Sequence, residues 1–231
     1  MADRGPQESA LVAAEENGRT LYLHARAIAS VKAEMQRDRA MRRDRRVAGE
    51  ITEARDGGIA VTVVDRTPSA IYRAVVSPDG TLQAPVEAVA APGELSAYES
   101  AAVRARSMAM AFDAPRCGKD YDAIAFPSSA SDGWMAYLLP RPARGSVPIG
   151  GSYRLEIEGE GVVASRPYTR SCIALAPSPN SVGMMITHLL DPVPTDVHVF
   201  WSLWEGKPFF VGVENGAWRI ADGRIAPLKG E

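Results

Sequence analysis

The sequence has few of the residues that most often carry metal or catalytic chemistry. Its 231 residues include two cysteines and three histidines, and the cysteines do not stand at the C-x-x-C spacing of zinc or redox motifs. Walker-type loops, G-x-G-x-x-G loops and G-x-S-x-G nucleophile elbows are also missing. We therefore expect no cofactor and no metal, and an enzyme is the less favoured class of protein.

Long apolar runs and an excess of one charge are absent as well. No stretch approaches the ~18 consecutive apolar residues that a membrane-spanning helix needs, so we expect no transmembrane segment. The formal net charge is −2, so the chain as a whole attracts neither nucleic acid nor anionic lipid. Nucleic acid is not an expected partner, whereas a protein partner stays open.

The N-terminus carries no apolar core followed by a small-residue cleavage site. Taken alone, this favours a cytoplasmic protein. Ala2 would also suit the first residue of a processed chain, and the protein would then be periplasmic or secreted. Both compartments stay open.

The two cysteines, Cys117 and Cys172, each precede a strand-like run. Neighbouring strands would bring them together as a disulfide, which stabilises a fold by about 4 kcal/mol in the chain-entropy model. The alternative is two buried free thiols, which are common in cytoplasmic proteins.

Helical periodicity marks two segments. Between about residues 11 and 46, apolar side chains recur at three- and four-residue steps, at Leu21, Ala25, Ile28, Val31 and Met35. His24 lies at the edge of this stripe, where we expect a core-edge histidine bonded to backbone or solvent. A second helix is predicted to begin at residues 92–93, with Ser96 contributing to its cap, and to end near residue 113. Arg104 and Arg106 lie off the centre of its apolar stripe.

Strand patterns fill most of the remaining chain. Four short strands at residues 47–52, 58–65, 70–76 and 82–89 predict an antiparallel meander, with Pro85 restricting the last to an edge. Further strands are predicted at residues 121–126, 134–139, 153–158, 162–166, 173–176, 182–188, 197–203, 208–213 and 217–220, and Asn215-Gly216 predicts a hairpin.

The resulting prediction is an α+β fold. An N-terminal amphipathic helix and a short antiparallel meander precede a second helix and a larger, mainly antiparallel sheet. The turn signals near residues 90–93 suggest domains at residues 1–91 and 92–231, and one continuous domain is the alternative.

The densest run of charge lies between Arg37 and Arg46. One interpretation is a solvated helix end, whose cations suit the negative end of the helix dipole. The other is a docking site for an acidic partner through the guanidinium groups of Arg42, Arg43, Arg45 and Arg46. Aromatic side chains for base stacking are not interleaved, which disfavours a nucleic acid at this site.

Two of the three histidines, His188 and His198, lie ten residues apart around a proline-rich turn with Asp191 and Asp196. Histidine is the commonest side chain for metal binding and proton transfer near neutral pH. The segment 182–220 resembles the end of the JAB (JAMM) metalloprotease-like domain. Thr195 falls at that family's serine, and His198 falls at its aspartate ligand.

That resemblance implies a hydrolase, or an inactive relative, centred on His188 and His198 with nearby acids. The zinc-binding histidine pair is absent, because Met185 and Thr187 occupy its positions. Alternation along a strand would turn His188 away from both residues and leave its ring without companions.

Trp201 and Trp204 have two interpretations, either as packing anchors at a sheet edge or as the lining of a shallow binding surface. The favoured function is a non-enzymatic binding or structural module, with the cell envelope as its place if the chain is exported. The JAB-like hydrolase or inactive relative and the docking protein that uses the segment 37–46 are the alternatives.

Overall fold

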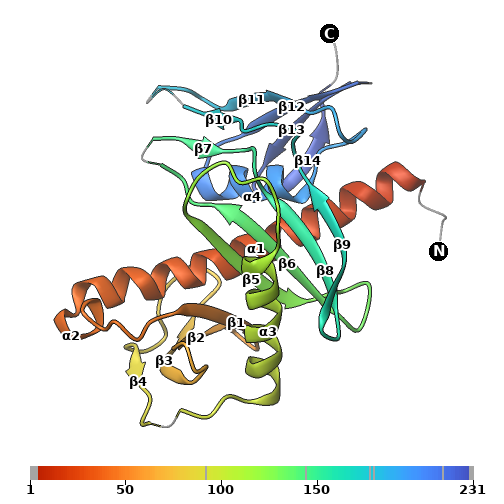
Figure 1. Ribbon diagram of the computed structural model, residues 1–231. Helices are drawn as coiled ribbons and strands as arrows, with labels where there is room; N and C mark the ends of the chain where they lie inside the picture. The colour runs from red at the N-terminus through yellow and green to blue at the C-terminus, as the bar shows by residue number, and fades with distance from the viewer. Residues whose placement is uncertain are drawn as a thin grey trace.

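The computed structural model describes residues 5–91, 93–143, 145–176, 178, 180–214 and 216–228. It confirms an α+β fold of helices and several antiparallel sheets (Figure 1). The helices are α1 (Pro6–Arg37), α2 (Arg39–Arg42), α3 (Ala97–Ala111) and α4 (Asp196–Glu205). Within the described ranges, no helix is both long enough and apolar enough to cross a membrane.

The predicted N-terminal meander is present as an antiparallel sheet with the order β1-β2-β3-β4. Its strands are β1 (Gly49–Arg55), β2 (Gly58–Val64), β3 (Ala70–Val76) and β4 (Glu87–Ala88). The last strand is much shorter than predicted, and a single bridge joins Val76 to Leu82 before it. Pro85 lacks an N–H group to donate between them, which explains the interruption.

A second antiparallel sheet has the order β5-β6-β8-β9. It consists of β5 (Tyr121–Pro127), β6 (Trp134–Pro140), β8 (Tyr153–Glu158) and β9 (Gly161–Pro167). One face packs small side chains such as Ala123 against Ala105 and Ala109 of α3. The other face, which includes Tyr137, joins the core around α1. Burial of both faces explains the continuous apolar runs of β5 and β6.

The C-terminal strands form a separate sheet with the order β11-β12-β13-β14. Its members are β11 (Met184–Thr187), β12 (Phe209–Val213), β13 (Gly216–Ala221) and β14 (Arg224–Pro227). Only the pair β11–β12 is parallel within this sheet. Val213 pairs with Gly216 in the predicted hairpin, whose Asn215 lies outside the described residues. Strands β7 (Val147–Pro148) and β10 (Ala174–Leu175) form a small separate pair.

The strand predicted at residues 197–203 is wrong, because this segment forms the helix α4. Seven of its ten residues are buried, from Asp196 to Ser202, so the segment shows no polar face that would reveal a helical period. Gly206 ends the helix in the left-handed conformation, with φ of 62°.

The two long helices begin or end at different residues from those predicted. Helix α1 ends at Arg37, because Asp38 leaves the helical conformation and accepts hydrogen bonds from two backbone N–H groups of α2. Helix α3 begins at Ala97 instead of residues 92–93, and Pro92 lies outside the described residues. Ser96 caps α3 in a capping box with Glu99, which confirms its predicted role.

Helix α1 crosses the molecule between the N-terminal sheet and the C-terminal elements (Figure 1). Its predicted apolar stripe is buried throughout. Gly18 allows α4 to approach closely, since a Cβ atom there would stand 2.5 Å from Cβ of Val199 and 2.7 Å from the carbonyl oxygen of Asp196. The position of α4 therefore depends on a residue without a side chain.

The sulfur atoms of Cys117 and Cys172 are 2.03 Å apart, which confirms the disulfide. One apolar core contains buried side chains from both sides of residue 91, including Leu21 and Val61 before it and Tyr137 and Phe209 after it. The division of the chain at residue 91 stays a prediction.

Candidate functional site

His188 lies directly after β11 with 3% of its surface exposed. The predicted alternation is present, because the neighbouring Met185 and Thr187 are exposed on the opposite side. The expectation that its ring lacks companions is wrong. The rings of His188 and His198 have centroids 4.8 Å apart, and His188 Nε2 is 2.7 Å from Asp191 Oδ2.

His198 faces His188 because it lies in the first turn of α4 and not on a strand. Its Nδ1 accepts a hydrogen bond of 3.1 Å from the backbone N–H of Thr195, so the hydrogen of the neutral ring is on Nε2. Burial lowers the pKa of His198 to about 3. The ring of His198 is therefore neutral near pH 7, and its Nδ1 atom accepts a hydrogen bond that caps the start of α4.

The two acids of this segment belong to different networks. Asp191 pairs with His188 and, at 2.5 Å, with Arg166. Burial alone would raise the pKa of Asp191, but the hydrogen bond from His188 and the charge of Arg166 hold it below its usual value. Asp196 is buried, accepts a hydrogen bond of 2.6 Å from the Tyr137 hydroxyl, and lies 3.6 Å from Arg154.

Asp191 and Asp196 both line a cavity of about 190 Å³, whereas His188 and His198 do not line it. The acids and the imidazoles therefore do not face one common space. Among the residues that the structure describes, no three histidine, cysteine, aspartate or glutamate side chains converge to hold a metal ion. The catalytic roles suggested for His188, His198, Asp191 and Asp196 stay predictions.

The third histidine, His24, is buried with 2% of its surface exposed. Its Nδ1 lies 2.7 Å from Oγ1 of Thr52, and its ring centroid is 5.0 Å from that of Phe126. Burial lowers its pKa to about 4. His24 is thus a core histidine, but its observed partner is a side chain and not the backbone group or solvent that was expected.

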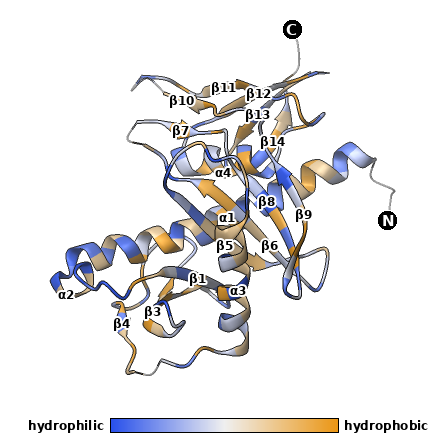
Figure 2. Ribbon diagram, in the orientation of Figure 1, coloured by the Kyte–Doolittle hydropathy of each residue, from blue (hydrophilic) through white to orange (hydrophobic). Residues whose placement is uncertain are grey.

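The basic segment lies at one end of the molecule, where Figure 2 shows hydrophilic residues gathered at α2. Arg37 pairs with Glu34, and Arg46 pairs with Asp44 at 2.6 Å. Arg42, Arg43 and Arg45 are exposed and form no ion pair with any described residue.

Trp201 and Trp204 lie together at the apolar end of a cavity of about 180 Å³, which we call the tryptophan cavity. Phe200 directly precedes Trp201 in sequence, and its ring centroid is 4.8 Å from that of Trp201 and 5.7 Å from that of Trp204. Ala25, Ile28 and Leu139 complete this apolar end. Nε1 of Trp201 is buried without a hydrogen-bond partner among the described residues.

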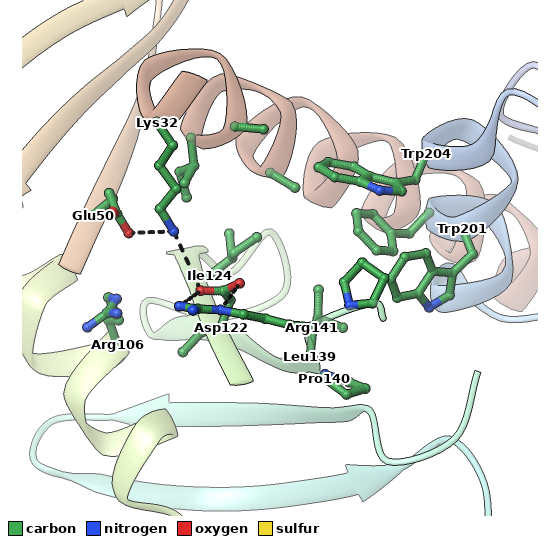
Figure 3. A pocket seen from close by; sticks show the side chains of 16 residues that line it. Lys32, Glu50, Arg106, Asp122, Ile124, Leu139, Pro140, Arg141, Trp201 and Trp204 are labelled. Carbon is green, nitrogen blue, oxygen red and sulfur yellow. Dashed lines mark hydrogen bonds and ion pairs between the residues drawn. The ribbon is translucent and has the colours of Figure 1, made fainter. Parts of the chain in front are cut away.

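The opposite end of the tryptophan cavity is charged (Figure 3). Lys32 of α1 lies 3.1 Å from Glu50 of β1 and 3.6 Å from Asp122 of β5. Arg141 makes two hydrogen bonds to Asp122, of 2.8 and 2.9 Å. Arg106 of α3 completes the set, and we call these five residues the charged cluster.

Asp122 is ionised at neutral pH. Burial would raise its pKa, but the hydrogen bonds from Arg141 and the charges of Lys32 and Arg106 lower it below the usual value. Arg106 itself makes no hydrogen bond or ion pair with any described residue. It is the unpaired cation of the cluster.

The tryptophan cavity continues into a wider cavity of about 690 Å³, which we call the outer groove. The charged cluster and Pro142 line both spaces. Arg42 lines the far part of the outer groove, whereas Arg43, Arg45 and Arg46 line neither space. The structure therefore brings Trp201, Trp204 and Arg42 to one continuous depression.

The charged cluster was not identified from the sequence. Its five members come from α1, β1, α3, β5 and the segment after β6, so no local motif connects them. The available signal was the position of Arg106 beside the apolar stripe of its helix.

Comparisons with protein-family models, with curated proteins and with solved structures find no match to this chain.

Proposed function

We propose that this protein is a non-enzymatic binding module whose ligand occupies the tryptophan cavity and extends into the outer groove. The observation that supports this most is the aromatic wall of Phe200, Trp201 and Trp204 beside a space of about 180 Å³. Ligand sites are typically concave and mostly apolar, with a few polar groups that fix orientation. The tryptophan cavity has this composition, with its charged cluster at one end.

Filling the cavity tests this proposal. The probe is N-phenyl-1-naphthylamine, a neutral fluorophore whose emission rises in apolar surroundings. Ala29 lines the cavity on α1, whereas Ala33, one turn further along, is exposed and lines neither space. We expect saturable binding to the wild type and to Ala33→Phe, and at least a tenfold loss of affinity in Ala29→Phe.

Two results would contradict the binding proposal. One is the absence of saturable binding to the wild type. The other is equal binding by Ala29→Phe and Ala33→Phe, since the probe would then lie elsewhere.

A JAB-like hydrolase or inactive relative is the second proposal. The adjacent rings of His188 and His198 and the Asp191 carboxylate support it. Because catalytic zinc usually has three protein ligands, this hypothesis predicts stoichiometric zinc binding that His188→Ala abolishes. Calorimetry that detects no zinc binding by the wild type would remove the hydrolase and leave the inactive relative.

A docking role for the segment 37–46 is a third proposal, supported by the exposed guanidinium groups of Arg42, Arg43 and Arg45, which form no ion pair with any residue that the structure describes. It predicts salt-sensitive retention on immobilised poly-glutamate that is weakened by Arg42→Ala combined with Arg43→Ala. Unchanged retention by this double variant would count against the proposal.

We also propose that the protein works in an oxidising compartment such as the cell envelope. The bonded pair of Cys117 and Cys172 supports this, because disulfides persist mainly in such compartments. Alkylation of thiols in intact cells should leave both cysteines unmodified until a reductant is added. Immediate modification of both would contradict the proposal.

A further inference from the structure

We infer that the ligand is an organic carboxylate with a flat apolar body, whose carboxylate binds Arg106 while the body lies against Trp201 and Trp204. This inference rests on the proposed function and adds the chemical class of the ligand. It follows from the charge balance of the cavity, from the position of Arg106 and from the shape of the apolar end.

The charged cluster contains one more positive than negative side chain. Lys32 is shared between Glu50 and Asp122, and Arg141 is bound to Asp122 through two hydrogen bonds. Both carboxylates are thereby engaged by cations other than Arg106. A single negative charge on the ligand would balance the cluster, whereas a second would lack a counter-charge there.

The Arg106 guanidinium is held in a defined place. It lies against the backbone of Gly49, where an added Cβ atom would stand 2.5 Å from Nη1. The side chain is half-buried, so it has lost part of its hydration without gaining a partner among the described residues. Arginine binds a carboxylate through two parallel N–H···O hydrogen bonds. A carboxylate is therefore a better acceptor for Arg106 than a neutral group would be.

The apolar end determines the other half of the ligand. Figure 3 shows Arg106 at one side of the cavity and the rings of Trp201 and Trp204 at the other. The remaining wall there is made of Phe200 and of small or aliphatic side chains such as Ala25 and Ile28. A planar ring system can stack on the indoles within about 180 Å³ while its carboxylate extends toward α3.

Calorimetric titration with 2-naphthoate and its neutral analogue 2-naphthamide tests the inference. We expect the wild type to bind the naphthoate at least tenfold more tightly than the amide. Arg106→Gln should remove this preference while still binding the amide. Arg104→Gln is the matched control, because Arg104 is exposed on the same helix and lines neither space, and it should keep the preference.

The possible failures differ between the two proposals. Equal affinity of the wild type for both naphthalenes, together with binding of N-phenyl-1-naphthylamine, would overturn the carboxylate assignment and leave the binding function standing. A preference that survives in Arg106→Gln would also overturn the assignment. If none of the three probes binds the wild type, the carboxylate assignment and the binding function both fail.

Discussion

The guanidinium of Arg106 occupies space that exists because residue 49 is glycine. The two residues come from α3 and β1, and their contact places an unpaired cation at the wall of a cavity that contains two tryptophans. The backbone at Gly49 is extended, and the three atoms nearest to an added methyl group all belong to the flexible end of the arginine. The cation can therefore be displaced without removing its charge.

We predict that Gly49→Ala weakens 2-naphthoate binding by about 3- to 10-fold, because the displaced guanidinium loses its two-pronged geometry. Affinity for 2-naphthamide and the midpoint of urea unfolding should change little. Gly161→Ala is the control, since Gly161 begins β9 with no neighbouring atom within 4 Å of an added Cβ. A naphthoate affinity unchanged in Gly49→Ala would contradict the role given to this contact.

For Gly18→Ala in α1, we predict a change in the free energy of unfolding that is opposite in sign to the usual effect of this substitution in a helix. Gly→Ala within a helix normally stabilises it by up to about 1 kcal/mol. Here the new methyl group would stand 2.5 Å from Cβ of Val199, so we expect Gly18→Ala to lower the free energy of unfolding by about 1–3 kcal/mol. Urea denaturation measures this loss.

A double-mutant cycle checks the cause of the Gly18 effect. A Val199→Gly background removes both Cβ and Cγ1 of Val199, which are two of the three atoms nearest to the added methyl group, so the cost of Gly18→Ala should fall. An identical cost in both backgrounds would show that the contact with the Val199 side chain is not responsible.

The sequence predicted those features that depend on neighbours along the chain. The stripe from Leu21 to Met35, the capping role of Ser96 and the antiparallel meander all have local periods or motifs, and the structure confirms them. The disulfide was also predicted, although the strands that follow its two cysteines, β5 and β10, belong to different sheets and are not neighbours.

Helix α4 and the charged cluster could not be predicted in this way, because neither depends on a local pattern in the sequence. The segment 197–203 contains valine and large aromatic side chains, which suit strands. Because the helix is buried on all sides there, its sequence shows no contrast between a polar and an apolar face. Thr195 before it and Gly206 after it were the remaining signs of a helix. The charged cluster was missed because it forms only when five separate segments meet.

Removing the disulfide should destabilise the fold. Replacement of Cys117 and Cys172 by alanine should lower the free energy of unfolding by about 4 kcal/mol, because the open chain gains entropy when it unfolds. Urea denaturation without reductant measures the difference. Thiol titration of the denatured, unreduced wild type should find no free thiol, and two thiols would contradict the bonded pair.

Stability should fall as the pH is lowered from about 6.5 toward 4. Burial lowers the pKa of His24 from 6.5 to about 4, so the unfolded chain takes up this proton first. The stabilising contribution of neutral His24 is thus complete above pH 6.5 and lost as the pH falls toward 4, at a cost of about 3 kcal/mol. His198, with a pKa of about 3, acts in the same direction.

Between pH 5 and 6.5, where unfolded carboxylates are still ionised, the histidines dominate this dependence. His24→Gln should reduce the slope of unfolding free energy against pH by up to about 1.4 kcal/mol per unit. Equal slopes in the variant and the wild type would contradict the assignment of His24 as a buried neutral group.

The most direct test of the binding account uses the indole N–H signals of the four tryptophans in a ¹H–¹⁵N spectrum. Trp201 and Trp204 line the tryptophan cavity, whereas Trp134 and Trp218 do not line it. Addition of 2-naphthoate should shift the signals of Trp201 and Trp204 in a saturable manner and leave the other two in place. Shifts confined to Trp134 and Trp218, or no shift at all, would contradict the account.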